Sequence, residues 1–503
     1  MFRIFGPPGT GKTTTLLNMV DDHLSKGVHP NHIAFLAFTK KAANEAKERA
    51  ASRFKLDPEK DLFFFRTLHS LALNLSEIRP EQVLSREHFL ELGQKIGISF
   101  GRISGMDEDI IDKQNNDHPI LNTINLARLR KVSLRQQYNE SYIEDDWNTV
   151  NYVHKCYIEY KKQRNLYDFT DMLEMFVKDY DRICPTFEIT FLDEAQDLSP
   201  LQWDIAHALD KKSKAMYAAG DDDQAIYRWA GADVDQFINL EGTSETLDQS
   251  FRVPRQIHKI AESIVDRIKH RYPKRYQPKE EEGTVKHMAR LDDIDLTEGQ
   301  WLILAQAGYI LNPVAETLKS MGLLFSHKGH RSISAKISSA VNGWEQLRKG
   351  KQITLDTARD VYSFMSSGTR VKRGFKKLSG IDDQDLLDMA TLQNSHGLVV
   401  GDELIWHKAL DRLPEESRVY ITALLRRGEK FNGEPRITVS TIHGSKGGES
   451  ENVVIFTDLS PAADDAMRIG NDDVHRVFYV AVTRAKQNLY IIEPDDNNRS
   501  YHI

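Results

Sequence analysis

The feature that most constrains this chain is a glycine-rich loop that directly follows its first apolar run. Residues 1–5 predict a short strand. The loop then reads Gly6, Pro7, Pro8, Gly9, Thr10, Gly11, Lys12 and Thr13, and Thr14 opens the helix predicted next. This spacing, G-x-x-x-x-G-K-T between a strand and a helix, is that of a phosphate-binding loop. The alternative, a Gly/Pro turn that binds nothing, is disfavoured by that strand–loop–helix context.

Each residue type in such a loop has a physical task. Glycines let backbone N–H groups approach phosphate oxygens, and the helix N-terminus directs positive potential at the anion. We expect Lys12 to reach the β and γ phosphates and the hydroxyl of Thr13 to bind Mg²⁺. The loop therefore predicts a nucleoside triphosphate and Mg²⁺ as ligands.

Composition limits the class of protein. The 503 residues suggest three or four domains, and 40% apolar with 28% charged residues is typical of a soluble globular protein. No run approaches eighteen apolar residues, so we expect a cytoplasmic protein that contacts no membrane. Cys156 and Cys184 stand far apart, which disfavours disulfides and Cys-ligated metals and indicates core thiols. A net charge of −7 excludes a uniformly basic surface but leaves room for a local basic groove.

Two further apolar runs end in polar residues. Residues 33–38 lead into Thr39 and Lys40, and the aromatic run 62–65 leads into His69 in the same manner. Open α/β sheets bind ligands at such strand ends. A solvated helix face is the alternative for the basic residues after Thr39, and a structural or surface histidine is the alternative for His69.

A pair of carboxylates follows the predicted strand 187–192. In a phosphate-loop ATPase, Asp193 holds Mg²⁺ while Glu194 orients and deprotonates the attacking water. The alternative is an acidic first turn that caps the next helix. Because the phosphate-binding loop is also present, the sequence favours the ATPase interpretation.

The predicted strand 215–219 brings Gln224 to the same edge, and Tyr227 and Trp229 follow. Aromatic rings beside a basic residue can stack on unpaired bases, although core packing is the general expectation for Tyr and Trp. Further along, Arg252 is a candidate arginine finger on the γ phosphate or, alternatively, a surface ion pair.

The remaining chain repeats this organisation. Residues 89–163 and 329–431 predict helical insertions, and the second carries the basic residues Arg370, Lys372, Arg373, Lys376 and Lys377 as a candidate duplex contact. A second sheet is predicted from strands 301–304, 323–326, 437–441, 453–457 and 489–492, with helices at 313–320 and 473–486. Six Lys or Arg residues in 267–279 predict a surface linker near a phosphate backbone or, equally, a solvated segment. The fold class is α/β with two parallel sheets.

In order along the chain, these motifs resemble those of the UvrD/Rep type of superfamily 1 DNA helicase (SF1A). The resembling segments are Gly6 to Thr13 (I), AFTKKAA from Ala37 (Ia), TLHS from Thr67 (Ib), DEAQD from Asp193 (II), GDDDQAIYRWAGA from Gly220 (III), QSFR from Gln249 (IV), TIHGSKGGE from Thr441 (V) and YVAVTRA from Tyr479 (VI). Single motifs such as IV are weak, but eight in the family's order are very specific.

The resemblance implies two RecA-like domains, each with an insertion. Domain 1A would comprise 1–88 and 164–250, 1B 89–163, 2A 251–328 with 432–503, and 2B 329–431. ATP would bind between 1A and 2A, and single-stranded DNA would cross their tops.

The resemblance also assigns roles. On the nucleotide side, Arg252 and Arg484 would reach the γ phosphate, Gln224 would sense it, Glu449 would approach the ribose and Phe251 would stack on adenine. On the DNA side, Phe38, Tyr227 and Trp229 match base pockets, and Thr39, Lys40, His69 and His443 match DNA contacts.

The chain departs from the family pattern at four places. Met1 begins the first strand, where the family usually has a preceding segment with an adenine-reading Gln (the Q motif), so we expect a compact member without it. Ala230 replaces an Arg, Gly448 replaces a Leu, and residues 304–308 lack an Arg that is often present.

The resemblance predicts a monomeric ATP-dependent helicase or translocase that moves 3′-to-5′ on single-stranded DNA and acts at single-strand/duplex junctions. Repair or replication proteins are the expected partners, in the cytoplasm of a bacterium or a phage-infected host. Two alternatives remain open: a translocase that displaces proteins without unwinding, and an ATP-switched DNA-binding recruitment factor. A helicase–nuclease is disfavoured, since only eighteen residues follow Ala485.

Overall fold

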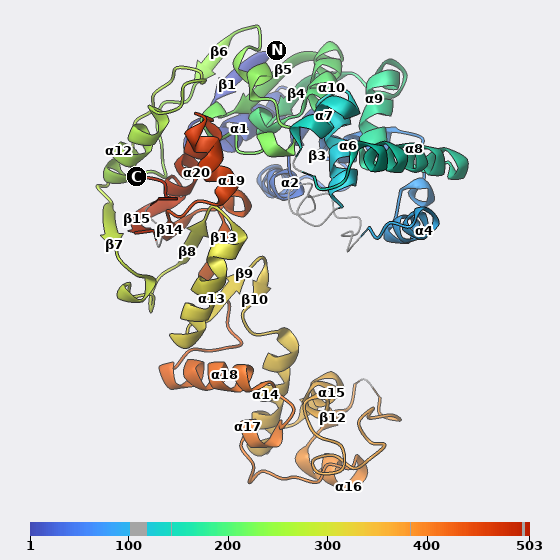
Figure 1. Cartoon of the computed structure of the whole chain (residues 1–503), viewed down its shortest axis with the longest axis vertical. Coiled ribbons are helices and arrows are strands. Elements are labelled where there is room, and N and C mark those ends of the chain that lie inside the picture. The colour runs from blue at the N-terminus through green and yellow to red at the C-terminus, as the bar shows by residue number, and fades with distance from the viewer. Residues whose placement is uncertain (101–117, 142, 383, 495–497) are drawn as a thin grey trace.

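The structure is a computed structural model that describes residues 1–100, 118–141, 143–382, 384–494 and 498–503. Two sheets with helices on both faces lie in the upper part of Figure 1, and a mainly helical lobe projects far below them. The expected fold class is confirmed, because the first sheet is parallel, the second is parallel apart from one hairpin, and each is interrupted by a helical insertion. Residues 101–117 of the predicted first insertion lie outside the described residues.

The first sheet has six strands, all parallel. Their spatial order is β3 (Phe65–Thr67), β2 (Ile33–Ala37), β4 (Phe187–Leu192), β5 (Ser213–Gly220), β1 (Phe2–Phe5) and β6 (Ser244–Thr246). The predicted strand at 62–65 was wrong by several residues, because it is Phe65–Thr67 that pairs with β2. The loops that carry Thr13, Asp193 and Gln224 leave this sheet at the carboxyl ends of β1, β4 and β5.

Helices cover both faces of the first sheet, as a parallel sheet requires. One face packs against α1 (Lys12–Ser25) and α2 (Lys40–Phe54). The other packs against α3 (Leu68–Leu75), α9 (Phe169–Ile183), α10 (Pro200–Lys211) and α11 (Val234–Ile238). Strand β2, which lies between β3 and β4, is buried along its whole length, so its continuous apolar run has no solvent-facing side.

The first insertion has a core of its own. Its described helices are α4 (Arg86–Ile96), α6 (Pro119–Leu129), α7 (Leu134–Glu140) and α8 (Trp147–Arg164). A buried ionic cluster ties it to α9: Arg128 and Lys161 both pair with Asp168 and Asp171. Among the described residues no helix is both long enough and apolar enough to cross a membrane.

The second sheet has seven strands in the order β10 (His330–Arg331), β9 (Phe325–His327), β13 (Ile437–Thr441), β8 (Trp301–Ala305), β14 (Ser450–Phe456), β15 (Ala485–Ile492) and β7 (Thr284–Met288). Every pairing is parallel except the β9–β10 hairpin. Around it lie α12 (Arg255–Val265), α13 (Leu311–Ser320), α19 (Pro461–Arg468) and α20 (Asp473–Val482). The predicted helix 473–486 is therefore too long, since Ala485 already pairs with Ser450 in the sheet.

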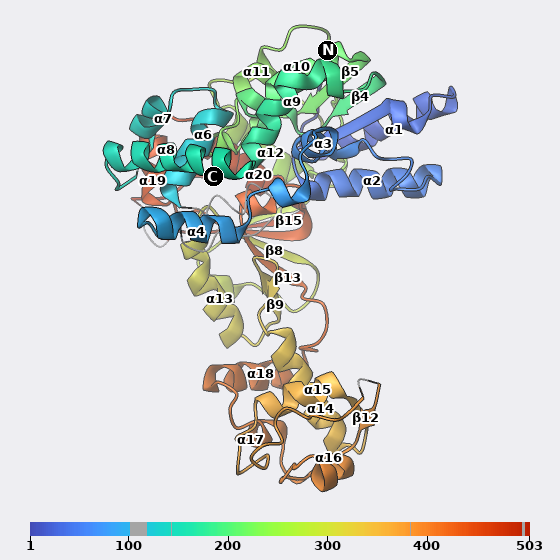
Figure 2. The ribbon, with the colours of Figure 1, turned by 90° about the vertical axis from the view of Figure 1, so that its right-hand side faces the viewer.

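The second insertion forms the projecting lobe seen in Figures 1 and 2. It contains α14 (Ala335–Arg348), α15 (Leu355–Ser363), α16 (Met389–Ser395), α17 (Trp406–Ala409), α18 (Glu415–Arg427) and the short strands β11 (Ile353–Thr354) and β12 (Leu386–Leu387). Its core is continuous with that of the second sheet, through α13 and α18. Within the lobe, Lys372, Arg373 and Lys377 are exposed.

The basic segment 267–279 is not the surface linker that its composition predicts. Lys274 is 2% exposed, and its ammonium lies 3.0, 2.5 and 2.6 Å from carboxylate oxygens of Asp221, Asp222 and Asp223. Tyr272 stacks on Phe5 at 3.9 Å, inside the core of the first sheet. The segment follows α12 of the second sheet yet packs against the end of β1, and two of its cations, Arg271 and Lys274, neutralise buried carboxylates of the first sheet.

Candidate nucleotide and DNA site

The loop between β1 and α1 has the tight geometry that its glycines permit. A Cβ on Gly6 would lie 1.9 Å from Cγ of Lys12. Gly9 has φ +72°, and a Cβ there would lie 2.3 Å from Cβ of Arg252. The short contact excludes a side chain at Gly6, and the short contact together with the positive φ angle excludes one at Gly9.

Thr13 and Asp193 meet at the floor of this loop. Thr13 Oγ1 donates a 2.8 Å hydrogen bond to Asp193 Oδ2. Burial and the adjacent Glu194 both raise the pKa of the Asp193 carboxyl. A cation bound at this carboxylate would therefore stabilise its ionised form. A hydroxyl and a carboxylate are the oxygen donors that Mg²⁺ prefers, so the two residues fit the expected metal site.

Glu194 occupies the adjoining position in a left-handed backbone conformation, φ 56°, which is uncommon outside glycine. Its carboxylate accepts a 2.6 Å hydrogen bond from Gln196 Nε2 and lies 4.0 Å from Lys12 Nζ and 3.6 Å from Lys446 Nζ. Burial alone would raise the pKa of Glu194, but Lys12 and Lys446 outweigh it and lower the pKa. The carboxylate is thus held ionised and aimed at the loop.

Arg484 crosses from the second sheet to the first. Its Nη2 donates a 2.7 Å hydrogen bond to Gln224 Oε1, and Gln224 Nε2 donates a 2.7 Å bond to Asp221. Burial lowers the pKa of Arg484 to about 9, so this guanidinium is strongly desolvated.

Arg252 lies directly above the loop. Its Nε donates a 2.6 Å hydrogen bond to Glu449, which also pairs with Lys486 at 2.8 Å. The segment carrying Arg252 is fixed by Ser250, whose Oγ donates a 2.7 Å bond to the Pro8 carbonyl. The printed contacts therefore connect the predicted catalytic residues of both halves, since Thr13 bonds Asp193, Arg484 bonds Gln224 and Arg252 bonds Glu449.

Phe251 stands at the rim of that cleft. Its backbone N–H donates a 2.8 Å bond to the Gly9 carbonyl, while its side chain is 74% exposed. An aromatic ring this exposed beside a phosphate-binding loop is available to stack on a base.

A group of aromatic residues lies where the two sheets meet, beyond the nucleotide cleft. Phe38 and Tyr227 are stacked with ring centroids 5.7 Å apart, and the Tyr227 hydroxyl donates a 3.0 Å bond to the His443 carbonyl. Trp229 is 42% exposed and packs edge-on against the His443 ring at 5.9 Å. Burial, and then Lys446, lower the pKa of His443 to about 4, so its ring is neutral near pH 7.

A cavity of about 460 Å³ adjoins these rings and is walled by both halves of the molecule. Ile226 and Trp229 line one side, and Thr441, His443 and Val477 line the other. Its size and its exposed indole suit an unstacked base.

Thr39 and His69, which are also predicted to contact DNA, make contacts within the protein. Thr39 Oγ1 accepts a hydrogen bond from the Ala42 N–H and caps α2, whose first residue is Lys40. His69 is 6% exposed and lies edge-on to Phe169 at 6.4 Å. Thr39 and His69 therefore have structural contacts in this conformation. Of the three aromatic residues predicted to stack on DNA bases, Phe38, Tyr227 and Trp229, only Trp229 is exposed.

Two lysines of the site were missed as functional candidates. Lys446 reaches from the second sheet to Glu194, Asp197 and the Gln224 carbonyl. The signal was available, since Lys446 is a lone cation among glycines just after a strand end. Lys274 is the other, and its triple carboxylate contact could not be read from a basic run.

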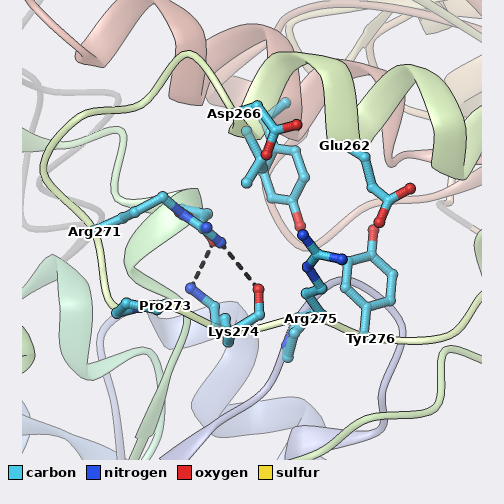
Figure 3. A pocket seen from close by; sticks show the side chains of 11 residues that line it. Glu262, Asp266, Arg271, Pro273, Lys274, Arg275 and Tyr276 are labelled. Atoms are coloured by element: carbon cyan, nitrogen blue, oxygen red, sulfur yellow. Dashed lines mark hydrogen bonds and ion pairs between the residues drawn. The ribbon is translucent and has the colours of Figure 1, made fainter.

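Lys274 lines a cavity of about 630 Å³, together with Pro7 and Asp223 of the first half of the chain and Glu262 and Tyr479 of the second. Figure 3 shows Arg271, Lys274 and Tyr276 along one extended segment below the helix end that carries Glu262 and Asp266. Arg271 forms two hydrogen bonds to the Asp223 carboxylate, of 2.7 and 2.6 Å. The segment therefore fastens the second half of the chain to the strand end that also carries Gln224.

Comparisons with known proteins agree with this geometry. Residues 2–245 match the family model of the UvrD/REP helicase N-terminal domain, and residues 408–495 match that of the UvrD-like helicase C-terminal domain. The two models together span about two thirds of the chain, including both halves of the cleft. The chain belongs to the UvrD/Rep helicase family.

Among individual relatives, the chain is 26% identical over 312 residues to the ATP-dependent DNA helicase PcrA of Bacillus subtilis, covering 58% of this chain and 41% of PcrA. It is 27% identical over 285 residues to the putative ATP-dependent DNA helicase YjcD of the same organism, covering 53% and 36%. The chain thus matches about two fifths of the length of these relatives. An arterivirus nonstructural protein 10 helicase solved with DNA aligns over 99% of this chain and 62% of its own, at 10% identity and a TM-score of 0.36, which adds nothing to the fold argument.

Proposed function

We propose that this chain is an ATP-driven DNA motor, which hydrolyses ATP between its two sheets and moves along single-stranded DNA to unwind duplex. The observation that carries the proposal is that one cleft joins residues of both sheets. Thr13, Asp193 and Glu194 follow strands of the first sheet, Arg484 precedes a strand of the second, and Arg252, in the connection between β6 and α12, pairs with Glu449 of the second. Family membership supports the same activity.

The chemistry follows from these positions. Phosphoryl transfer to water depends mainly on positioning and charge neutralisation. Mg²⁺ held by Thr13 and Asp193 would neutralise part of the negative charge of the phosphates. Lys12 binds the β and γ phosphates, and Glu194 orients the attacking water and accepts its proton. Arg252 and Arg484 approach the γ phosphate from the opposite sheet, so hydrolysis requires a closed cleft.

Translocation uses the aromatic group at the junction of the sheets. Trp229, Tyr227 and Phe38 would stack on bases, and each cycle of cleft closure and opening would pass the strand between pockets on the two halves. Lys372, Arg373 and Lys377 of the second insertion are exposed, and we expect them to contact duplex phosphates. The 3′-to-5′ direction is proposed from family resemblance.

Strand displacement tests the proposal. Substrates with a 3′ or a 5′ overhang are offered with each nucleoside triphosphate in turn. We expect unwinding of the 3′-tailed substrate with ATP and Mg²⁺. ATP hydrolysis and displacement of a bound protein without unwinding would make the chain a protein-stripping translocase. DNA binding that depends on ATP but proceeds with negligible turnover would make it a recruitment factor.

A further inference from the structure

A groove between the first insertion and α9 lies outside the residues assigned to the nucleotide and DNA sites. It has a volume of about 430 Å³ and is lined by side chains of α6, α8 and α9, which Figure 1 shows together beside the first sheet. Its apolar walls are Ile124, Ile158, Leu166, Tyr167 and Met175. Ligand sites usually have volumes of about 300–1,000 Å³, so the groove is large enough to accept apolar side chains of a partner.

Charged residues that line the groove are already paired with one another. Lys161 Nζ donates a 2.6 Å hydrogen bond to Asp171, and Arg128 donates bonds of 2.6 and 2.8 Å to Asp171 and Glu174. The side chain of Lys161 is only 9% exposed, so this network belongs to the packing of α8 against α9. The groove therefore offers a partner a fixed shape in which the carboxylates are compensated.

Three lysines beside the groove have no such partner. Lys155, Lys162 and Lys178 are exposed, and their ammonium groups make no ion pair or hydrogen bond within the described part of the chain. Lys178 lines the groove itself. Ile158, which is 47% exposed, stands on α8 one turn from Lys155 and one turn from Lys162, so these three side chains share one stripe of the helix. An exposed apolar side chain among unpaired cations is complementary to an acidic segment with apolar anchors.

Nucleic acid fits the groove less well than such a segment. Phosphates could approach the three lysines, but Asp171 and Glu174 line the same groove and its walls are apolar, so a sugar–phosphate backbone would gain little by entering it. A protein segment, in contrast, can bury an apolar side chain against Ile158 and keep its carboxylates at the lysines around the edge.

Helix α6 separates the groove from the aromatic group at the junction of the sheets. Three of its residues pack around Gly231, which follows Trp229 by two positions: Leu126, Leu129 and Arg130. Ile124 and Arg128 line the groove instead. A partner in the groove and DNA at Trp229 would therefore use different sides of the same helix.

We propose that this groove is a docking site for another protein, which inserts a large apolar side chain of an acidic segment beside Ile158 and places carboxylates at Lys155, Lys162 and Lys178. The proposal goes beyond the motor activity, since it names a surface through which the chain joins a partner. Because the lysines are exposed, the contact weakens as the salt concentration rises. Because DNA uses the other side of α6, docking and DNA binding do not exclude each other.

Fluorescence anisotropy of a labelled synthetic peptide tests the docking site. The peptide alternates aspartate with leucine and phenylalanine, and the full chain is titrated into it at low salt. We expect saturable binding with a dissociation constant below about 1 mM. Ile158→Glu should weaken binding at least about tenfold, because it replaces the apolar contact by a like charge. Lys178→Glu should weaken it at least about threefold, and saturating oligo-dT should change the wild-type affinity by less than about twofold.

Matched controls separate the groove from general surface effects. Val419→Glu and Lys349→Glu make the same two substitutions at exposed positions of the second insertion and should keep the wild-type affinity for the peptide. Two altered peptides, one with lysine in place of aspartate and one with serine in place of leucine and phenylalanine, should each bind at least about tenfold more weakly. All four variants should keep the wild-type melting temperature, because the substituted side chains are exposed.

Four outcomes would overturn the proposal. These are the absence of saturable peptide binding below about 1 mM, wild-type affinity in Ile158→Glu and Lys178→Glu, equal affinity for the serine peptide, and competition by oligo-dT, which would assign the groove to nucleic acid. None of these measurements uses ATP, so the proposed motor activity stands or fails by its own assay.

Discussion

Arg484 and Gln224 are 260 positions apart in the chain, yet Arg484 Nη2 donates a 2.7 Å hydrogen bond to Gln224 Oε1. The bond joins the second sheet to the strand end of the first that carries the proposed γ-phosphate sensor. Both side chains are buried, so the interface between the sheets is closed around them. Any change in the separation of the sheets must break or re-form this contact.

Glu194→Gln is expected to bind ATP normally and to hydrolyse it at least about a hundredfold more slowly, because the amide cannot accept the proton of the attacking water. Single-turnover hydrolysis and binding of a fluorescent ATP analogue measure the two effects separately. Glu188→Gln, on the strand that precedes Glu194 but paired with Lys214 at the surface, is the control and keeps wild-type turnover. Near-normal turnover of Glu194→Gln would remove Glu194 from the base role.

Trp229→Ala is expected to keep its DNA-free ATPase rate and to lose most stimulation by single strands. One stacked base contributes about 1–3 kcal/mol, so oligo-dT affinity should weaken about 5- to 150-fold. Fluorescence anisotropy and a coupled ATPase assay give both values. Tyr152→Ala removes an equally exposed ring from α8 and serves as the control. Unchanged stimulation would assign Trp229 a packing role only.

Lys274→Met is expected to lower the free energy of unfolding by about 3–5 kcal/mol, since the buried carboxylates of Asp221 and Asp222 lose their cation and Asp223 keeps only Arg271. Calorimetric melting temperatures measure the loss. Lys214→Met, whose ammonium is 75% exposed and pairs with Glu188, should change stability by less than about 1 kcal/mol. An unaltered melting temperature for Lys274→Met would mean that the three aspartates are neutralised in another way.

Cys184 is expected to react slowly with a thiol reagent in the native protein. Burial raises its pKa to about 11, so at pH 8 only about one thiol in a thousand is ionised. Because the thiolate is the reactive form, the labelling rate of Cys184 in Cys156→Ser protein should rise about tenfold per pH unit between pH 7 and 9. Mass spectrometry of the labelled protein measures it, and a rate independent of pH would contradict the raised pKa.

Much of the fold could be predicted because the apolar runs of this chain that end in polar residues are compatible with buried strands and with little else. β4 and β13 have the bounds that were predicted from their apolar residues and the residues that flank them. The end of α20 could not be predicted, because residues 483–486 contain no glycine or proline. The helix stops there because Ala485 pairs with Ser450, a contact 35 residues away in the chain.

The candidate site was predictable where spacing carries chemistry and not where partners are distant. Thr13, Asp193 and Glu194 follow from the loop and the strand end. The environment of Lys274 does not, because a basic run next to tyrosines is equally compatible with solvent and with buried carboxylates. Only the fold shows that Asp221, Asp222 and Asp223 lie opposite Lys274. His69 illustrates the reverse case, since its motif is clear but its ring is buried.

The stacking of Tyr272 on Phe5 has a consequence for any attempt to divide the molecule. A gene cut after residue 250 would separate two halves at the predicted boundary, but the amino-terminal fragment would lack the ring that covers its own first strand. The carboxy-terminal fragment would in turn carry Tyr272 and Lys274 without their partners. We therefore expect that the fragments expressed apart are poorly soluble, and that co-expression restores them as a split protein whose reassembly reports on this one interface.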